Sequence, residues 1–379
     1  MPSSIVKYPG GKLRELPGIR SHMPLSFDRF VDPFVGGGSV FCGIDAKRYA
    51  INDKSEDLMN LYRLVARGGH ELTDAIELVG RAWLGLDEWF FGHREMVALY
   101  RRYLAGDVSE DDLARECVDV LRGQEDGLVA VVDEACLSRG LLYMRRLGVD
   151  FPRKMARMVV LDRTRRHLPD EDVLENILGV YKAGMYFVMR GLYNDRTCLS
   201  DVWRAVTYLF MRDYCYSSMF RFSTKGNFNV PYGGISYNAK DFTRHVSEYL
   251  DSELMDRMSR TVIGCEDWEA FVRRIRVGAG DFLFLDPPYD SNFSTYDGNA
   301  FDEVEQRRLA AYLTGECDCD FMLVVKRTDL MDELYADGAE VACGRHLHVS
   351  YFDKAYAVSF MNRNDRKVTH MMVTNYGEA

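Results

Sequence analysis

The sequence contains 379 residues, 47% of them hydrophobic, and has a formal net charge of −10 at pH 7. This length is enough for one large domain or two moderate ones with a substantial core. The lack of any run of 18 consecutive apolar residues excludes an ordinary membrane-spanning helix. The acidic balance disfavours a protein that binds polyphosphate over its whole surface. The charge is uneven, however: residues 68–180 contain 22 acidic and 15 basic residues, whereas residues 201–246 contain three acidic and six basic ones.

Three features of the sequence bear on the cellular compartment and on metal binding: the cysteines, the histidines and residues 1–7. The nine cysteines have no regular spacing, so we expect reduced thiols rather than a disulfide framework. Residues 1–7 lack the apolar core of a signal peptide. His346 and His348 lie on one face of a predicted strand, but no third ligand is nearby, so no metal site is predicted. Together these features predict a cytoplasmic protein.

Residues 27–66 predict an alternation of strands and helices. Residues 27–31 suit a strand, the glycine triplet 36–38 suits a turn, and Ser39 begins a helix. Residues 49–51 suit a second strand, after which apolar residues follow at helical spacing. This pattern is typical of the first part of an α/β domain.

The middle of the chain changes character twice. Residues 67–200 are dominated by helical periodicity and predict a helical insertion, in which Ser109 and the acidic residues after it resemble a helix N-cap. Residues 201–250 are richer in aromatic, polar and glycine residues. Alternation around Lys225-Gly226 predicts a β-hairpin with a basic tip.

The α/β pattern resumes in residues 251–379. A helix is expected after Asp302 and another near Thr328. The expected strands are 281–285, 321–325, 347–351, 357–360 and 368–374. A sheet that is interrupted by a helical insert and then completed is the simplest account, so residues 1–66 and 251–379 are expected to form one α/β domain.

Residues 32–39, Asp-Pro-Phe-Val-Gly-Gly-Gly-Ser, join a predicted strand to a predicted helix. Glycines at such a turn let a ligand approach the backbone, and a helix N-terminus favours a carboxylate. The methionine carboxylate of S-adenosylmethionine would fit here, with Asp32 taking its ammonium group. Asp53 ends the next strand, where an acid commonly bonds ribose hydroxyls. An ordinary βα turn and a helix N-cap are the alternative interpretations.

Residues 286–289, Asp-Pro-Pro-Tyr, follow an apolar strand, and the two prolines make this strand end rigid. The Asp286 carboxylate and the Pro287 carbonyl can accept both hydrogens of an exocyclic amino group, while Tyr289 stacks on the ring. N6 of adenine is a poor nucleophile because its lone pair is delocalised, so these bonds would orient it for in-line methyl transfer. A strand-ending turn with a buried tyrosine is the alternative.

Three motifs in this order carry a family resemblance: Lys-Tyr-Pro-Gly-Gly-Lys at 7–12, Asp-Pro-Phe-Val-Gly-Gly-Gly-Ser-Val-Phe at 32–41, and Asp-Pro-Pro-Tyr at 286–289. Together they resemble the Dam-type (class alpha) DNA adenine N6-methyltransferases. Residues 221–233 are similar to that family's target-recognition hairpin. The resemblance implies a Rossmann-like methyltransferase sheet, with S-adenosyl-L-methionine as the donor and double-stranded DNA as the substrate.

The resemblance also implies site residues by position. The catalytic residues that would hold the base are Asp286, Pro287, Pro288 and Tyr289. Asp267 and Trp268 match the segment that contacts the donor's adenine. The other donor-site residues are Lys7, Tyr8, Gly11, Lys12, Asp32, Phe34, Gly36, Asp53 and Asp286.

The predicted DNA-contacting residues are Tyr216, Ser217, Met219, Arg221 and Asn227, in segments that resemble the family, and Lys225, Arg363 and Arg366 as candidate phosphate contacts. Arg221 matches the arginine with which family members read a guanine of GATC, a natural bidentate contact. Residues 216–219, Tyr-Ser-Ser-Met, stand where GATC-specific members usually carry Tyr-Asn-Gly-Leu. This departure concerns the recognised sequence rather than the chemistry.

These observations predict a bacterial or phage-encoded, site-specific methyltransferase that flips an adenine out of duplex DNA and methylates its N6. Cytosine N4 methylation, which uses the same lip, and a non-catalytic, donor-sensing DNA-binding regulator are the alternatives. The acidity of residues 67–200 suits a protein partner or self-association. The same insertion holds a basic patch that would extend the DNA footprint, made of Arg153, Lys154, Arg157, Arg163, Arg165 and Arg166.

Overall fold

The computed structural model describes residues 1–8, 10–165, 167–195, 197, 199–288, 301–355 and 367–377. The chain forms two compact units, one of Met1–Arg67 with Asp251–Ala379 and one of Gly68–Leu250. The first unit is discontinuous in sequence because the second is inserted into it. In the described ranges, no helix has both the length and the apolar content needed to cross a membrane.

The first unit is built on a seven-stranded sheet in the order β3-β2-β1-β4-β5-β9-β8. Strands β1 to β5 run parallel, whereas β9 is antiparallel to both of its neighbours. The strands are β1 (Arg29–Asp32), β2 (Arg48–Ile51), β3 (Thr261–Ile263), β4 (Asp281–Leu285), β5 (Asp320–Lys326), β8 (His348–Ala355) and β9 (Lys367–Thr374), beside a separate pair of β6 (Glu340–Val341) and β7 (Arg345–His346).

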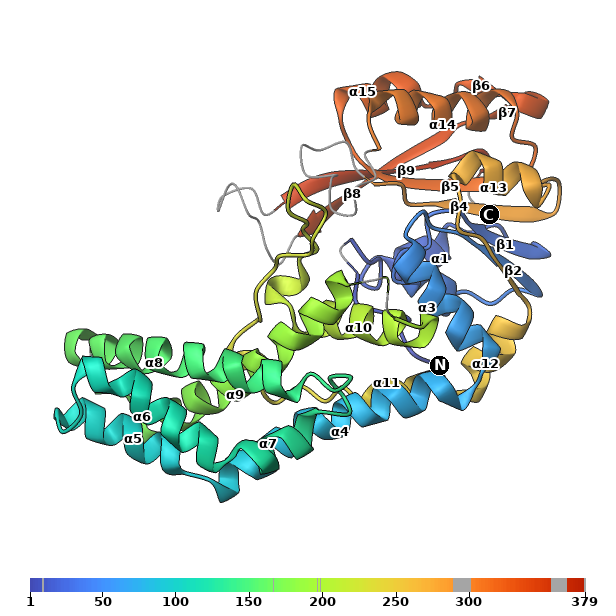
Figure 1. Cartoon of the computed structure of the whole chain (residues 1–379). Coiled ribbons are helices and arrows are strands. Elements are labelled where there is room, and N and C mark those ends of the chain that lie inside the picture. Colours follow the sequence, from blue (N-terminus) through green and yellow to red (C-terminus); the bar gives the residue numbers. More distant parts are fainter. Residues whose placement is uncertain are drawn as a thin grey trace. The chain divides into compact units, whose positions relative to one another are not determined.

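Helices cover both faces of this sheet, with α13 and α14 on one side and α1 and α3 on the other (Figure 1). Successive strand residues point to opposite faces, so Val31 joins the core under α13 and α14, while Phe30 packs against Tyr49 and Phe282. The helices are α1 (Leu16–Ser21), α2 (Ser39–Gly43), α3 (Glu56–Arg67), α12 (Ser252–Ser259), α13 (Trp268–Arg274), α14 (Glu303–Gly315) and α15 (Asp329–Leu334).

The sequence predicted most of these elements. Asp302 caps α14 by accepting a hydrogen bond from the Glu305 amide at 3.1 Å, and Thr328 caps α15 through its hydroxyl. Strand β3 was not predicted, because it is three residues long and incompletely buried. The predicted strand 357–360 lies outside the described residues.

The second unit is helical, and α9 (Asp170–Asn194) packs against α8 (Gly140–Arg165), α10 (Asp201–Tyr214) and α4 (His70–Gly92). The predicted cap at Ser109 is confirmed, since its hydroxyl accepts a hydrogen bond from the Asp112 amide at 3.2 Å. The other helices of this unit are α5 (Glu95–Ala105), α6 (Glu110–Gly123), α7 (Glu125–Val132) and α11 (Arg244–Tyr249).

The predicted hairpin is present in this second unit, although as isolated bridges rather than long strands. Phe222 and Phe228 form an antiparallel bridge, and the Gly226 amide donates to the Ser223 carbonyl at 2.8 Å to close the turn. The Asn194 side chain of α9 bonds both the amide and the carbonyl of Phe228, at 2.8 and 3.0 Å. The hairpin is therefore fixed to α9 by hydrogen bonds between the Asn194 side chain and the hairpin backbone.

Candidate active site

Two acidic residues of the first unit stand at neighbouring strand ends. Asp32 is the last residue of β1, and Asp286 directly follows β4. These strands are parallel neighbours, and the sheet order reverses between them. In open α/β sheets, ligands bind beyond the carboxyl ends of the strands at such a switch point. Both predicted acids are thus placed where a ligand is expected.

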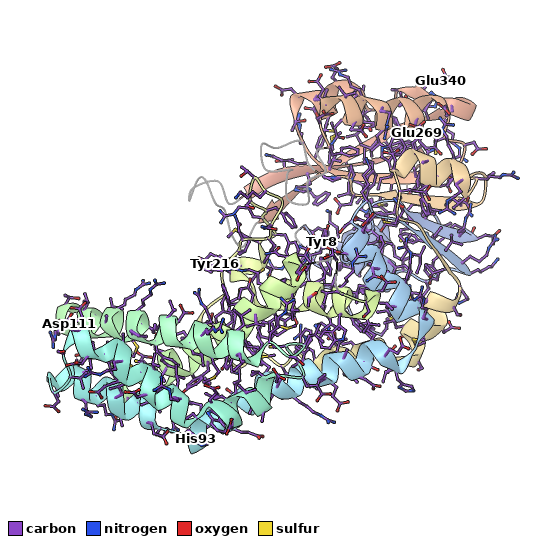
Figure 2. The ribbon with its side chains drawn as sticks, viewed as in Figure 1. Tyr8, His93, Asp111, Tyr216, Glu269 and Glu340 are labelled. Carbon is purple, nitrogen blue, oxygen red and sulfur yellow. The ribbon has the colours of Figure 1, made fainter. Side chains whose placement is uncertain are left out.

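The glycine turn after β1 leaves no space for side chains. Gly38 has a left-handed φ of +78°, and a Cβ there would lie 2.3 Å from the Tyr62 hydroxyl. A Cβ on Gly37 would lie 2.5 Å from the Val6 carbonyl, in the loop that carries Tyr8 (Figure 2). The turn therefore presents bare backbone because packing on two sides requires glycine.

Asp32 is only 2% exposed. Its described hydrogen bond comes from the Phe34 amide at 3.1 Å. Burial raises the pKa of Asp32 well above its ordinary value of 3.8; the Phe34 bond opposes this shift, and the charges of Asp286 and Asp53 add to it. A buried carboxylate with incomplete compensation fits the binding of a cationic group.

Asp53 and its neighbour Asn52 hold the adjoining strand ends. Asp53 accepts from the amides of Gly36 at 3.3 Å and Ser55 at 2.9 Å, so it supports both the glycine turn and the turn that leads into α3. Asn52 is 1% exposed and donates to the Pro33 and Glu266 carbonyls, at 3.2 and 3.0 Å. Sequence reasoning missed this bridging role of Asn52, although the residue stands beside a predicted site residue.

Lys12 joins the N-terminal loop to the lip after β4. Its side chain is 1% exposed, and Nζ donates to the Asp286 carboxylate. The Lys12 amide donates to the Ser39 hydroxyl at 3.0 Å. On the other side, Gln306 of α14 donates to the Pro288 carbonyl at 3.2 Å. No sequence pattern predicted this Gln306 contact. The predicted base-stacking Tyr289 lies outside the described residues.

Asp267 and Trp268 are placed in structural roles. Asp267 caps α13 through the Glu269 amide and pairs with Arg308 at 2.7 Å and Lys54 at 3.0 Å. Burial alone would raise the pKa of Asp267, but the bonds from Arg308 and Lys54 lower it. Trp268 is 1% exposed and belongs to the core. A contact of this pair with the donor's adenine stays a prediction.

The remaining donor-site residues differ in exposure. Phe34 is partly buried, with its ring 5.5 Å from that of Phe301 in an edge-to-face arrangement. Tyr8 is half-buried, whereas Lys7 and Gly11 are exposed. The donor-site residues that precede the glycine turn in the chain thus include both exposed residues and partly buried aromatic ones.

The predicted DNA-contacting residues that the structure describes all lie in the second unit. Arg221, Lys225 and Asn227 are exposed on the hairpin, and Arg221 Nε donates to the Asn229 side chain at 3.1 Å. Tyr216, labelled in Figure 2, is also exposed, as is Ser217, while Met219 is half-buried. Arg363 and Arg366 lie outside the described residues.

The strand order, the buried acid after β1 and the rigid lip after β4 are those of a Rossmann-like methyltransferase. The chain belongs to the D12 class N6 adenine-specific DNA methyltransferases, whose family model matches residues 8–134 and 171–350. The predicted family, fold class and adenine-specific DNA methylation are confirmed by this match. S-adenosylmethionine is the methyl donor that this class of enzyme implies.

Named relatives agree with this assignment. The chain is 23% identical to the DNA N-6-adenine-methyltransferase of Escherichia phage P1, over 82% of this chain and 28% of that protein. It is 23% identical to the type II methyltransferase M1.LlaDCHI of Lactococcus lactis subsp. cremoris, over 98% of this chain and 94% of that protein. It is 21% identical to the DNA adenine methylase of Serratia marcescens, over 81% of this chain and 76% of that protein. This chain thus spans about a quarter of the phage protein and most of the other two.

Proposed function

We propose that this chain methylates N6 of an adenine flipped out of duplex DNA, at a site formed by the glycine turn after β1 and the lip after β4. The observation that carries this proposal is the placement of Asp32 and Asp286 at the switch point of the sheet, with Lys12 bonded to Asp286. The proposal assigns Asp32 to the donor and Asp286 to the base.

The first unit fits the donor that the family implies. Asp32 would hold its ammonium group, because a cation stabilises a buried carboxylate whose own hydrogen bonding is incomplete. The bare backbone of residues 36–38 would accept its carboxylate, and Asp53 would bond its ribose. When bound, S-adenosylmethionine supplies an electrophilic methyl group on a sulfonium.

The lip orients the amino group of the target base. A carboxylate offers two oxygens and about four acceptor directions, so Asp286 can accept from the base amino group while it is bonded to Lys12. Gln306 occupies the carbonyl of Pro288 rather than that of Pro287, which leaves the Pro287 carbonyl for the second amino hydrogen. Two such bonds direct the nitrogen lone pair out of the ring plane. Catalysis then rests on positioning and electrostatics.

The hairpin supplies the contact with DNA in this proposal. Its exposed tip carries Lys225, suited to a phosphate, and Arg221, suited to a bidentate contact with guanine. The Arg221–Asn229 bond holds the guanidinium in a defined orientation. Which bases flank the adenine is then decided by residues 216–221.

The test is methyl transfer from labelled donor to duplex DNA, followed by nucleoside analysis. We expect N6-methyladenine from the wild-type chain and at least a thousandfold loss of rate in Asp286→Ala. Asp286→Asn is the matched variant that keeps the shape and removes the charge. N4-methylcytosine as product would identify the rival chemistry. Donor-dependent DNA binding without any methylated base would identify a regulator instead of an enzyme.

A further inference from the structure

The second unit contains a hollow of about 420 Å³ between α8, α9 and the segment 231–235. Its lining includes one acid, Asp150, and several cations. We call it the α8–α9 basic pocket, and its cationic residues are Arg146, Arg153, Lys154, Arg157 and Arg190. This concentration is unusual for a chain whose net charge is −10.

Most of these cations lack an anionic partner. Arg146 pairs with Asp150 at 2.6 Å. Arg190 donates to the Val230 carbonyl, a neutral acceptor, at 3.2 Å. In the described part of the chain, no ion pair engages Arg153, Lys154 or Arg157. Burial, and then the charge of Arg157, lower the pKa of Lys154, so the protein itself does not stabilise this positive cluster.

The spacing of the cations gives them a common face. The four cations at 146, 153, 154 and 157 of α8, with Asp150 between them, are spaced at intervals of three or four. Such residues are neighbours on one side of a helix. The whole of α8 contains seven basic and two acidic residues. A linear array of phosphates matches such a stripe better than a single small anion does, because it can contact several cations at once.

An aromatic surface lies beside this charge. The Arg146 guanidinium stands 4.3 Å from the centre of the Phe187 ring, and that of Arg190 stands 5.6 Å from it. Tyr232 and Ile235 complete this apolar side of the lining. A ligand with both phosphate oxygens and apolar sugar faces is complementary to the combination.

The pocket shares its helix with the anchor of the hairpin. Tyr186 and Arg190 both donate to the Val230 carbonyl, and Asn194 bonds the backbone of Phe228. Residues 186, 190 and 194 lie one turn apart and span about 12 Å of α9 at 1.5 Å per residue. Residues of one helix, α9, thus both line the pocket and hold the hairpin.

The helix that carries most of the pocket cations, α8, lies outside the segments that match the family model. The family model matches residues 8–134 and 171–350, whereas α8 spans Gly140–Arg165. Arg153, Lys154 and Arg157 therefore stand on a helix outside the matched segments, packed against α9 within them (Figure 1).

We propose that the α8–α9 basic pocket binds the phosphodiester backbone of duplex DNA beside the segment read by the hairpin. The site lengthens the DNA footprint without reading bases, so that the insertion contributes affinity and register rather than specificity. The proposal rests on the proposed function, because it takes DNA to be the substrate.

The experiment compares two double variants of the 379-residue chain. Arg153→Glu/Arg157→Glu reverses two exposed pocket cations, and Arg115→Glu/Arg145→Glu reverses two exposed cations of the second unit that do not line the pocket. Binding of a fluorescent duplex is measured by anisotropy between 50 and 200 mM salt. The pocket variant should bind at least tenfold more weakly at low salt, with a log–log salt slope shallower by about 2, roughly one per lost phosphate contact. The control variant should keep the wild-type slope.

Duplex length gives an independent readout. Shortening the DNA flanks should weaken binding by the wild-type chain and leave the pocket variant unaffected once the added contact is gone. The pocket variant should raise KM for DNA and leave kcat and donor binding unchanged. If charge reversal perturbs folding, the milder variant Arg153→Gln/Arg157→Gln replaces it. This variant should also make the salt slope shallower.

The outcomes separate this proposal from the proposed function. If the wild-type chain produces no N6-methyladenine, the proposed function fails. If the wild-type chain methylates DNA but the pocket and control variants share one salt slope and one length dependence, only the pocket proposal is overturned. It is equally overturned if reversal changes the oligomeric state or binding of an acidic protein while DNA binding stays the same.

Discussion

Each unit of the chain contains a deeply buried aspartate, and the two are treated in opposite ways. Asp213 of the second unit is 2% exposed and accepts from His245 at 2.9 Å and from Arg244 at 2.6 Å. Burial alone would raise the pKa of Asp213, but the bonds and charges of His245 and Arg244 lower it. Asp32 of the first unit is as buried, yet its pKa is raised.

The difference supports a structural role for Asp213 and the ligand-binding role proposed for Asp32. A buried charge is tolerated when its partners replace the lost hydration, as His245 and Arg244 do for Asp213. Asp32 lacks such replacement, and a site that must receive a cation has to leave that compensation incomplete. Asp213 is thus compensated by the charges of its own unit, whereas the proposed function assigns Asp32 to the cationic group of a ligand.

The largest effect is expected from breaking the structural carboxylate. Asp213→Asn leaves the buried His245 and the Arg244 charge without their anion, and should lower the free energy of unfolding by about 3 kcal/mol. Urea unfolding, followed by circular dichroism, measures this. A loss below about 0.5 kcal/mol would contradict the structural role assigned to Asp213.

Asp32→Asn should weaken donor binding without lowering the stability of the fold, and the free-energy change should be smaller than that of Asp213→Asn. Removing the charge that would hold the donor's ammonium should weaken donor binding by roughly 10- to 100-fold, because a hydrogen bond to a charged group contributes about 1.5–3 kcal/mol. Stability without donor should be equal or higher. Titration calorimetry and thermal unfolding measure the two quantities on one preparation, and destabilisation with unchanged donor affinity would erase the contrast with Asp213.

The pH dependence of stability sharpens the contrast further. The raised pKa of Asp32 means that the folded state holds its proton more tightly, so stability is lost as pH rises from 3.8 through the folded pKa. The lowered pKa of Asp213 means the opposite, with stability lost as pH falls below 3.8 through its folded pKa. The Tm advantage of Asp32→Asn over wild type should therefore grow from pH 4 upward, and saturating donor should abolish it. An advantage independent of pH would show that Asp32 does not titrate in this way.

The smallest effect concerns the backbone near the hairpin. Ser218 has a left-handed φ of +52°, and its buried hydroxyl has no hydrogen-bond partner among the described residues. Ser218→Gly removes both costs and should raise stability by about 1 kcal/mol. Ser217→Gly, with a φ of +53° and an exposed side chain, is the control and should gain less. A gain in stability would show that the second unit tolerates an unfavourable backbone conformation and a buried hydroxyl in residues 216–219, as the first unit tolerates a buried carboxylate at Asp32.

The sequence predicted the elements that depend on local pattern. The apolar run of β4, the glycine turn, the caps at Ser109 and Asp302 and the helix that starts near Thr328 are encoded within a few residues, and the structure confirms them. The contacts that complete the site are different in kind. Lys12 meets Asp286 across 274 positions, and Asn52 meets Glu266 across 214, so only the fold brings them together.

The residues of the second unit show the same limit. A basic stretch from Arg153 to Arg166 was evident in the sequence, but Arg190 and Phe187 join it only because α8 packs on α9. Of that stretch, the side chain of Arg165 and all of Arg166 lie outside the described residues, and Arg163 lies outside the pocket lining. The prediction of a protein partner for residues 67–200 stays a prediction.

The bond between Lys12 and Asp286 also has a consequence for biosynthesis. Strand β1 pairs with β4, which a ribosome delivers about 250 residues later, after the entire second unit. During synthesis, one edge of β1 therefore stays unpaired until β4 is made, while the helices of the second unit can already fold. The Lys12–Asp286 bond forms only when both parts of the discontinuous first unit have met, so under the proposed function a chain that ends before β4 lacks the lip that holds the base.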